Sequence, residues 1–396
     1  MLGTKTMGSL LLTLIYICFV SLGLPDSLLG SAWPTLHTEI AVPVSYAGII
    51  SMVIFAGTIL SSLFSDKLLN KFGTGRVVAV SVAMTALALF GFSVSCRFWM
   101  LLAWSVPYGL GAGAVDAVLN KYVALHNKAQ HMSWLHCMWA AGASVSPYIM
   151  SFSLVRFNDF SYGYLFVSVI QAVLTAVIFA SMPLWKRGRK NSTEYETGKE
   201  SAGTLSFKEI FSIKGAVPCF FMFFCYCSLE LTTSLWASSY LVEIWGTTPE
   251  RAAAFASMFY IGIMVGRFVN GFLAMKLSDR FLIRMGFGII GAGVVLLFIP
   301  LHSVFALFGF VVIGLGCAPI YPCIIHMTPD VFGKENSQAM IGVQMAFAYT
   351  GFLTMPSLFG IIAENISISL MPVYILALLI LMAAMHEKVA ENSKKD

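Results

Sequence analysis

The segment Ser65–Gly73, with the sequence SDKLLNKFG, returns in related form as SDRFLIRMG at Ser278–Gly286. Six of the nine positions match in residue type, and the two copies are 213 residues apart. Each copy begins where one long apolar run ends and leads into another, so each is expected to include part of a short polar loop between two helices. The repeat therefore predicts that a unit of several helices has been duplicated within the chain.

The composition places the chain in a lipid bilayer. Its residues are 58% hydrophobic and 11% charged, with a mean hydropathy of +0.82, whereas soluble domains carry about 25% charged residues. The apolar runs are continuous and mostly exceed the ~20 residues that a helix needs to cross the hydrocarbon core. Helices are therefore favoured over the alternating strands of a membrane β-barrel. We expect an all-α, multi-pass integral membrane protein, located in the bacterial inner (cytoplasmic) membrane.

Twelve transmembrane helices are predicted, at residues 9–33, 43–66, 77–95, 98–125, 131–154, 162–184, 213–241, 251–276, 282–301, 303–327, 335–363 and 367–386. The first run is too long for the apolar core of a signal peptide, so it is retained as the first helix. With the N-terminus in the cytoplasm, 20 of the 24 Lys and Arg residues lie on the cytoplasmic side. The positive-inside rule therefore places both termini there. The same distribution accounts for the net charge of +5, and no nucleic-acid partner is expected.

Three further matches between the halves support the duplication. Gly109–Gly111 corresponds to Gly314–Gly316 at an offset of 205 residues, Gly142 and Pro147 to Gly351 and Pro356 at 209, and Ser27, Leu28 and Ser31 to Ser234, Leu235 and Ser238 at 207. Two pseudo-symmetric six-helix bundles, 1–184 and 213–396, are therefore predicted, joined by a cytoplasmic linker at 185–212. This plan resembles the major facilitator fold, in which solute binds between two parallel halves.

Several helix motifs narrow the resemblance to the fucose permease-like, sugar-transporting branch of this superfamily. The motifs are GAVDAVLN at Gly113–Asn120, the Trp134–His136 segment with Gly142 and Pro147, Gly314–Pro322, and Gly342–Gln344. The resemblance covers nearly the whole chain and implies a sugar:proton symporter. One departure is that Asp26 follows Gly23-Leu24-Pro25, where proton-coupled sugar carriers of this branch have an Asn before the acid.

Three acidic residues, Asp26, Asp116 and Glu230, fall well inside predicted helices. A carboxylate within a membrane helix is costly and normally faces a cavity or a partner, so each is a functional candidate. Asp26 and Asp116 are the candidates for proton coupling. Pro25 removes a backbone donor beside Asp26 and predicts a bend in the first helix. The alternative for both acids is a purely structural hydrogen bond to another helix.

Polar and aromatic residues on several predicted helices are candidates for binding the solute, because a sugar needs acceptors for its hydroxyls and an aromatic plane for its C–H faces. They are Asn120, His136, Trp139, Tyr226, Glu230, Trp236, Tyr321 and Gln344. The alternative for the aromatic members is interhelical packing. Arg267 is assigned to the cytoplasmic half of its helix and Glu230 to the outer half, a depth difference of roughly 10–15 Å. A direct pair between them is therefore not expected, and Arg267 is assigned to a tie near the polar loops.

The duplicated loop segments carry the candidates for cytoplasmic gating. These are Asp66, Lys67 and Arg76 in the first half and Asp279, Arg280 and Arg284 in the second. Their charges could bond to neighbouring helix ends when the cytoplasmic side is closed, and the alternative is that they only set the topology.

Together these features predict a secondary active transporter that imports a sugar or sugar-like polyhydroxylated solute, coupled to a cation, preferably the proton. The alternative is a proton-coupled exporter of a drug or metabolite. Gly142–Pro147 argues mildly against export, because Ser146 replaces the second Gly of the GxxxGP element typical of antiporters. No enzyme activity, cofactor or metal site is expected, and the eight cysteines suggest no disulfide framework. A carrier of this plan can work as a monomer.

Overall fold

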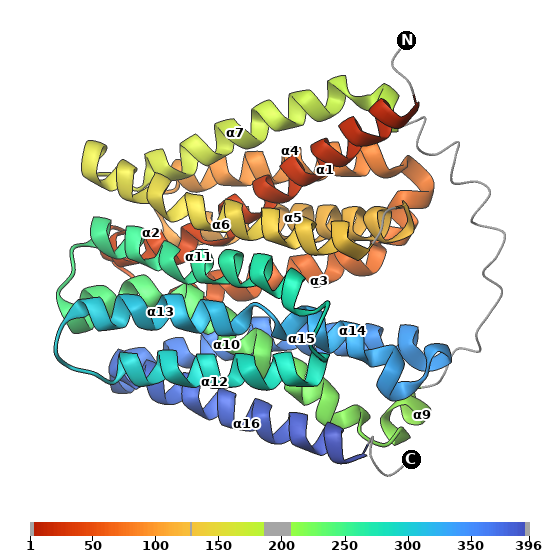
Figure 1. Cartoon of the computed structure of the whole chain (residues 1–396). Helices are drawn as coiled ribbons and strands as arrows, with labels where there is room; N and C mark the ends of the chain where they lie inside the picture. The colour runs from red at the N-terminus through yellow and green to blue at the C-terminus, as the bar shows by residue number, and fades with distance from the viewer. Residues whose placement is uncertain (1–3, 127–128, 186–206, 393–396) are drawn as a thin grey trace. The chain divides into compact units, whose positions relative to one another are not determined.

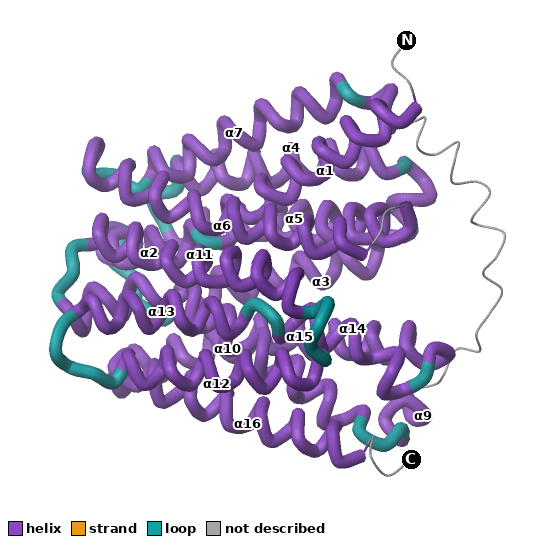
Figure 2. The backbone as a smooth tube through the Cα atoms, viewed as in Figure 1, coloured by secondary structure: helices purple, strands orange, loops and turns teal. Residues whose placement is uncertain are grey.

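The computed structural model describes residues 4–126, 129–185 and 207–392, and these residues form helices and short connections without a strand (Figures 1 and 2). The predicted all-α fold class is confirmed. By length and apolar composition, ten stretches can cross a membrane. One of them, Ala339–Glu391, contains two helices, and the helix at Ala129–Phe157 is not among the ten. The cytoplasmic position of the termini stays a prediction.

Two of the predicted membrane helices are broken near their middle. The first consists of α1 (Thr4–Asp26) and α2 (Leu28–Glu39), and the tenth of α13 (Ser303–Cys317) and α14 (Ile320–Phe332). The other long helices are α3 (Tyr46–Phe72), α4 (Thr74–Ser93), α5 (Phe98–His126), α6 (Ala129–Phe157), α7 (Ser161–Ala180), α10 (Ala216–Trp245), α11 (Pro249–Leu273), α12 (Asp279–Leu297), α15 (Lys334–Ile362) and α16 (Met371–Asn392). The short elements are α9 (Phe207–Ser212), a π-helical turn at Ala363–Ser367 and a 3₁₀ turn at Ile368–Leu370.

The two copies of the duplicated segment adopt different local structures. Ser65–Phe72 continues α3 as helix, and the chain turns at Gly73, whose φ of 80° suits a residue without a Cβ. In the second copy, Asp279–Gly286 begins α12. There the Ser278 hydroxyl accepts a hydrogen bond from the backbone N–H of Phe281 at 3.4 Å and caps the helix. The loop expected after residue 66 is therefore helical up to Phe72, and the helix predicted from residue 282 begins three residues earlier, at Asp279.

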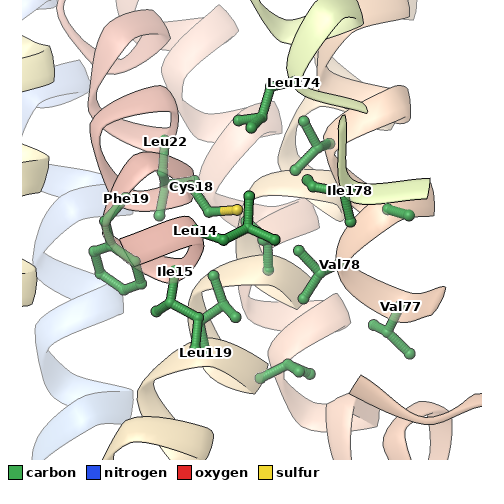
Figure 3. Packing of buried hydrophobic residues seen from close by; sticks show 14 of the residues in the cluster. Leu14, Ile15, Cys18, Phe19, Leu22, Val77, Val78, Leu119, Leu174 and Ile178 are labelled. Atoms are coloured by element: carbon green, nitrogen blue, oxygen red, sulfur yellow. The ribbon is translucent and has the colours of Figure 1, made fainter. Parts of the chain in front are cut away.

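The chain divides into two compact units. The first comprises residues 1–42 and 49–200, and the second comprises 43–48 and 201–396. Most of the predicted linker, 185–212, lies outside the described residues, so its boundaries stay a prediction. Within the first unit, side chains of α1, α4, α5 and α7 form an apolar core that includes Leu14, Cys18, Val78, Leu119 and Ile178 (Figure 3). This core holds α1 against the rest of its own bundle.

The duplicated glycines make equivalent helix contacts in the two units. A Cβ at Gly109 of α5 would lie 2.1 Å from the carbonyl oxygen of Ile54, and one at Gly314 of α13 would lie 2.1 Å from that of Phe259. Both the glycines and their partners are 205 residues apart. Likewise, a Cβ at Gly142 of α6 would meet the backbone of α1, and one at Gly351 of α15 that of α10. Small residues thus allow the same close backbone approach in both bundles.

The glycine contacts give a matched test on α15. Gly351→Ala would place a Cβ 2.5 Å from the Phe224 carbonyl oxygen, whereas Gly342 faces open space. We expect Gly351→Ala to lower the unfolding temperature of the purified protein by roughly 5 °C, because α10 and α15 must separate. Gly342→Ala should leave it unchanged. Equal unfolding temperatures for the two variants in a thermal scan would contradict this account of the packing.

Candidate functional site

The break between α1 and α2 lies at Asp26 and Ser27, which confirms the predicted bend. Pro25 has no N–H, so the carbonyl of Ser21, four residues earlier, loses its helical donor. Gln171 of α7 replaces that donor, because its Nε2 donates to the Ser21 carbonyl oxygen at 2.6 Å while its Oε1 accepts from the Ser21 hydroxyl at 2.8 Å. On the other side of the break, the Ser27 hydroxyl donates to the Ala143 carbonyl oxygen at 2.8 Å. The break is therefore fixed by neighbouring helices.

The Asp26 carboxylate is held from two other helices and remains exposed. Tyr108 of α5 donates its hydroxyl to Oδ1 at 2.8 Å, and Trp139 of α6 donates its indole N–H to Oδ2 at 2.7 Å. Both donors are neutral. The Asp26 side chain is nevertheless exposed at the surface of its unit, in the middle of an apolar stretch.

Asp116 lies on α5, the helix that also carries Tyr108 and Asn120. Asn120, one turn further along, donates its amide to Asp116 Oδ1 at 2.8 Å, as their spacing suggested. Its own Oδ1 is buried and accepts no hydrogen bond from the described residues. The charges of Asp116 and Asp26 are close enough to interact. Among the described residues, neither carboxylate has an ion-pair partner.

Sequence reasoning missed Tyr108 and Gln171. A spacing signal existed for Tyr108, because it precedes Asp116 by eight residues, about two helical turns. Gln171 had no such signal, since its role depends on the packing of α7 against α1. Of the remaining candidates in this unit, His136 packs edge-on against the Phe19 ring, with centroids 5.9 Å apart.

In the second unit, Arg267 of α11 pairs with Glu230 of α10, with 3.7 Å between Nη2 and Oε1. The expectation that the two residues differ too much in depth is wrong. It assigns Glu230 to the outer half of its helix and Arg267 to the cytoplasmic half, which overstates the difference in depth. Counted from the turn between Trp245 and Pro249, Glu230 is about 15 residues along α10 and Arg267 about 18 along α11. Their depths thus differ by only ~4–5 Å, which an Arg side chain spans.

Two of the other solute-binding candidates in this unit are buried and form hydrogen bonds to neighbouring helices. Trp236 is fully buried, and its indole N–H donates to the Pro356 carbonyl oxygen at 2.9 Å. Gln344 is also fully buried, and its Nε2 donates to Thr328 Oγ1 and to Cys219 Sγ, both at 3.0 Å. Neither side chain is left open to a solute, so both are omitted from the site proposed below.

Two tyrosines lie near the Glu230 pair. Tyr226 is buried one turn before Glu230, and its ring centroid is 6.2 Å from that of Tyr321 on α14. The Tyr321 hydroxyl is 3.5 Å from Met345 Sδ. Tyr226 therefore lies beside the ion pair and Tyr321 lies beside Tyr226, and both stay candidates.

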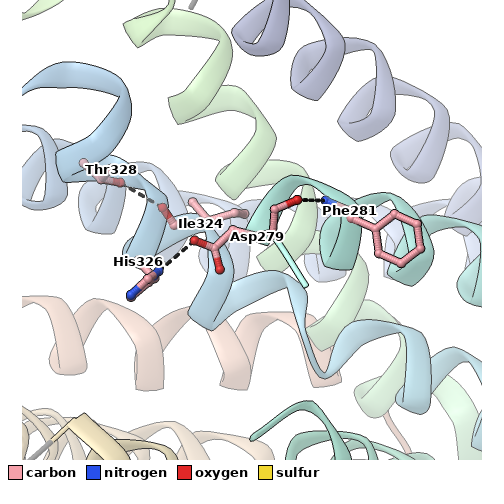
Figure 4. Close-up of polar contacts among 6 residues, drawn as sticks. Asp279, Phe281, Ile324, His326 and Thr328 are labelled. Carbon is pink, nitrogen blue, oxygen red and sulfur yellow. Dashed lines mark hydrogen bonds and ion pairs between the residues drawn. The ribbon is translucent and has the colours of Figure 1, made fainter. Parts of the chain in front are cut away.

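The loop charges of the second unit bond to helices of the same unit. His326 Nδ1 on α14 is 2.7 Å from Asp279 Oδ2 (Figure 4). Arg284 of α12 binds Glu387 of α16 through two contacts of 2.8 and 2.6 Å. Arg280 is partly buried.

In the first unit, Lys67 lies over the Phe64 ring at 5.4 Å and Arg76 is exposed, whereas the Asp66 side chain lies outside the described residues. The gating role of all six loop residues stays a prediction. Within the described part of the chain, no group of His, Cys, Asp and Glu could hold a metal ion, and all eight cysteines are free.

The sequence matches the Major Facilitator Superfamily over residues 15–243 and 219–395. It is 24% identical to Bypass of stop codon protein 6 of Saccharomyces cerevisiae, covering 90% of this chain and 77% of that protein. It is 25% identical to the cis,cis-muconate transport protein of Acinetobacter baylyi, covering 82% and 83%, and 20% identical to the glucose/mannose transporter GlcP of Bacillus subtilis, covering 81% and 80%.

A crystal structure has the same fold. It is that of a bacterial homolog to the human lysosomal transporter Spinster, in an inward-facing and occupied conformation. The TM-score is 0.70, with 11% sequence identity, and the alignment covers 99% of this chain and 98% of that one. At this identity the likeness shows the fold alone.

Replacement of Trp236 by Phe should reduce stability and not solute affinity, whereas replacement of Trp139 by Phe should reduce transport more than stability. Trp236→Phe removes a buried hydrogen bond worth about 1 kcal/mol and should lower the unfolding temperature by ~2–4 °C while solute affinity stays unchanged. Trp139→Phe removes a donor to the exposed Asp26 and should impair transport more than stability. Thermal scans and uptake by reconstituted protein measure the two effects. Loss of solute affinity in Trp236→Phe at unchanged stability would restore that residue to the solute site.

Proposed function

Because the chain belongs to the Major Facilitator Superfamily, a family of membrane transporters and not of enzymes, we propose that it imports a sugar or sugar-like polyhydroxylated solute together with protons, by alternating access. The observation that carries this proposal is the exposed Asp26 carboxylate at a helix break, bonded to Tyr108 and Trp139 and close to Asp116. The site thus combines two carboxylates, the Trp139 ring and the Asn120 Oδ1 oxygen, which accepts no hydrogen bond from the described residues.

The two carboxylates of the first unit support proton coupling. Their hydrogen-bond donors are neutral, and neither has an ion-pair partner among the described residues. Two uncompensated negative charges within a membrane domain are costly. A proton on one carboxylate relieves that cost, and its release when the site opens to the other side would couple transport to the proton gradient.

The neighbouring groups support a polyhydroxylated solute. Asn120 offers a buried acceptor oxygen without a hydrogen bond from the described residues. The Trp139 ring is only partly buried and presents an aromatic plane next to the carboxylate that its N–H binds. The Bacillus subtilis relative is a glucose/mannose transporter, which agrees with this solute class.

Within the superfamily, we assign the chain to the fucose permease-like branch on the helix motifs given above. The same proposal includes cytoplasmic termini, a bacterial inner-membrane location and a functional monomer. The proton is preferred over sodium as the coupling ion, because the site combines carboxylates with neutral donors. Proton-coupled export of a drug or metabolite is the alternative that the first experiment below excludes or supports.

Counterflow in proteoliposomes tests the solute class. A panel of monosaccharides should exchange against a labelled sugar, whereas a panel of lipophilic cations should not compete. Competition by the cations without exchange of any sugar would favour the exporter.

The Asp116→Asn variant tests proton coupling. The amide keeps the shape and an acceptor for Asn120 but binds no proton at neutral pH, so solute-driven proton uptake and accumulation against a gradient should both be lost. A pH-sensitive dye inside proteoliposomes measures the uptake. Glu364→Gln, the same change at an exposed acid, is the control and should behave like the unaltered protein. If Asp116→Asn retains both uptake and accumulation, proton coupling through Asp116 is wrong.

A further inference from the structure

Helix α14, the second half of the broken tenth membrane helix, is attached to its neighbours by two kinds of polar contact. On one side, Gln344 Nε2 of α15 donates to Thr328 Oγ1 at 3.0 Å, and both side chains are buried. On the other side, His326 Nδ1 lies 2.7 Å from Oδ2 of Asp279, the first residue of α12 (Figure 4). The first contact joins neutral groups, whereas the charge of His326 depends on pH. The attachment of α14 to α12 can therefore respond to pH.

The backbone allows α14 to move separately from α13. Pro319 and Pro322 have no N–H, so the carbonyls of Leu315 and Ala318 lose their helical donors. At its other end, α14 stops at Gly333, whose φ of 85° marks a turn before α15. A helix bends more readily where proline interrupts its backbone bonds. The side-chain contacts of α14 therefore decide how firmly it is held against its neighbours.

The Asp279 carboxylate contacts α14 at a second position. Cys323, one turn before His326, exposes only 2% of its surface, and its thiol interacts with Asp279 and with Asn270 of α11. The Asp279 and His326 side chains are 18% and 78% exposed. The contact thus joins an exposed imidazole to a carboxylate that also covers a buried thiol. Movement of α14 away from α12 would uncover that thiol.

The charges around His326 favour its protonated form. Among the described residues, two acids act on it, Asp279 of α12 and Asp330, one turn further along α14. The helices α10, α13 and α15 also pack against α14, and their described side chains add no further titratable group at His326. Asp279 directly follows the polar turn between α11 and α12, so solution at this end of the helices reaches the imidazole.

Protonation of His326 strengthens its contact with Asp279. The 2.7 Å separation is typical of a charge-assisted hydrogen bond, which is roughly twice as strong as a neutral one. The added attraction is fully present below about pH 6.5, the ordinary pKa of histidine, and is lost as the pH rises further. Because the imidazole is largely exposed, solvent screens the pair, and we expect the fraction of detached α14 to change only about threefold.

We propose that His326 and Asp279 form a pH-sensitive latch, which holds α14 against α12 when the solution at the turn between α11 and α12 is acidic. Detachment of α14 then requires the loss of a charge-assisted hydrogen bond. Acid at this end therefore slows the helix movements on which alternating access depends. The effect on transport rests on the proposed function, whereas the latch itself does not. In the orientation favoured by the Lys and Arg distribution, this turn is cytoplasmic, so import slows as the cytoplasm acidifies.

Alkylation of Cys323 in the purified protein tests the latch without requiring transport. The probe is N-ethylmaleimide, and peptide mass spectrometry measures the labelling rate of Cys323 relative to that of the exposed Cys96. The ratio removes the general increase of thiol reactivity with pH. Between about pH 5.5 and pH 8, on either side of the ordinary pKa of histidine, the ratio should rise roughly threefold, because α14 detaches more often.

Two variants of His326 fix its charge in opposite ways. His326→Gln is neutral at both pH values, so its labelling ratio should be high throughout. His326→Arg is charged at both, so its ratio should stay low throughout. His302→Asn is the control, because it removes another exposed histidine and keeps an acceptor for the Val304 N–H at the start of α13. This variant should behave like the unaltered protein.

Counterflow of a labelled sugar in proteoliposomes, with the same pH on both sides, tests the effect on transport. At about pH 5.5, His326→Gln should exchange roughly threefold faster than the unaltered protein, and at about pH 8 the two should be equal. Equal exchange rates at both pH values would overturn the regulatory role of the latch.

Two labelling results would overturn the latch itself. One is an unaltered protein whose Cys323 to Cys96 ratio is the same at both pH values. The other is a His326→Gln variant that keeps the full pH dependence of the unaltered protein. Absence of any sugar exchange in the unaltered protein would instead refute the proposed function, and the labelling experiment would still decide whether the latch exists.

Discussion

Every backbone group of a helix in lipid needs a partner inside the protein, and this constraint governs both the packing and the site. Regular helices meet it by themselves and then pack through small residues. The glycines at 109 and 314 let their helices approach the carbonyls of Ile54 and Phe259 by the same distance. Because close packing fixes each bundle, a helix can be interrupted only where neighbours supply the missing partners.

The interruption at Pro25 shows how such a repair creates a site. Gln171 satisfies the carbonyl that proline leaves free, and Ser27 anchors the following turn to α6. The break then presents Asp26 to Tyr108 on α5 and to Trp139 on α6. The contacts that stabilise the irregular backbone thus also position the Asp26 carboxylate. Gln171 therefore has a structural role, whereas Asp26 is a candidate for transport.

The intramembrane carboxylate of the second unit has different partners from that of the first. Its carboxylate, Glu230, is buried and faces a permanent cation, whereas Asp26 is exposed and faces neutral donors. The two halves of the duplicated scaffold therefore surround their intramembrane carboxylates with chemically different partners.

The sequence by itself determined the helical membrane fold, the duplication, the bend at Pro25 and the Asp116–Asn120 contact, because apolar length, internal repeats and four-residue spacing are local properties of the chain. Only the tertiary structure decided which side chains from different helices meet. Tyr108, Trp139 and Gln171 converge on one break, Trp236 is used for packing, and Arg267 reaches Glu230. The expectation for Glu230 and Arg267 was wrong because both residues lie at nearly the same number of residues from the turn that joins α10 to α11, and an Arg side chain spans the remaining ~4–5 Å of depth.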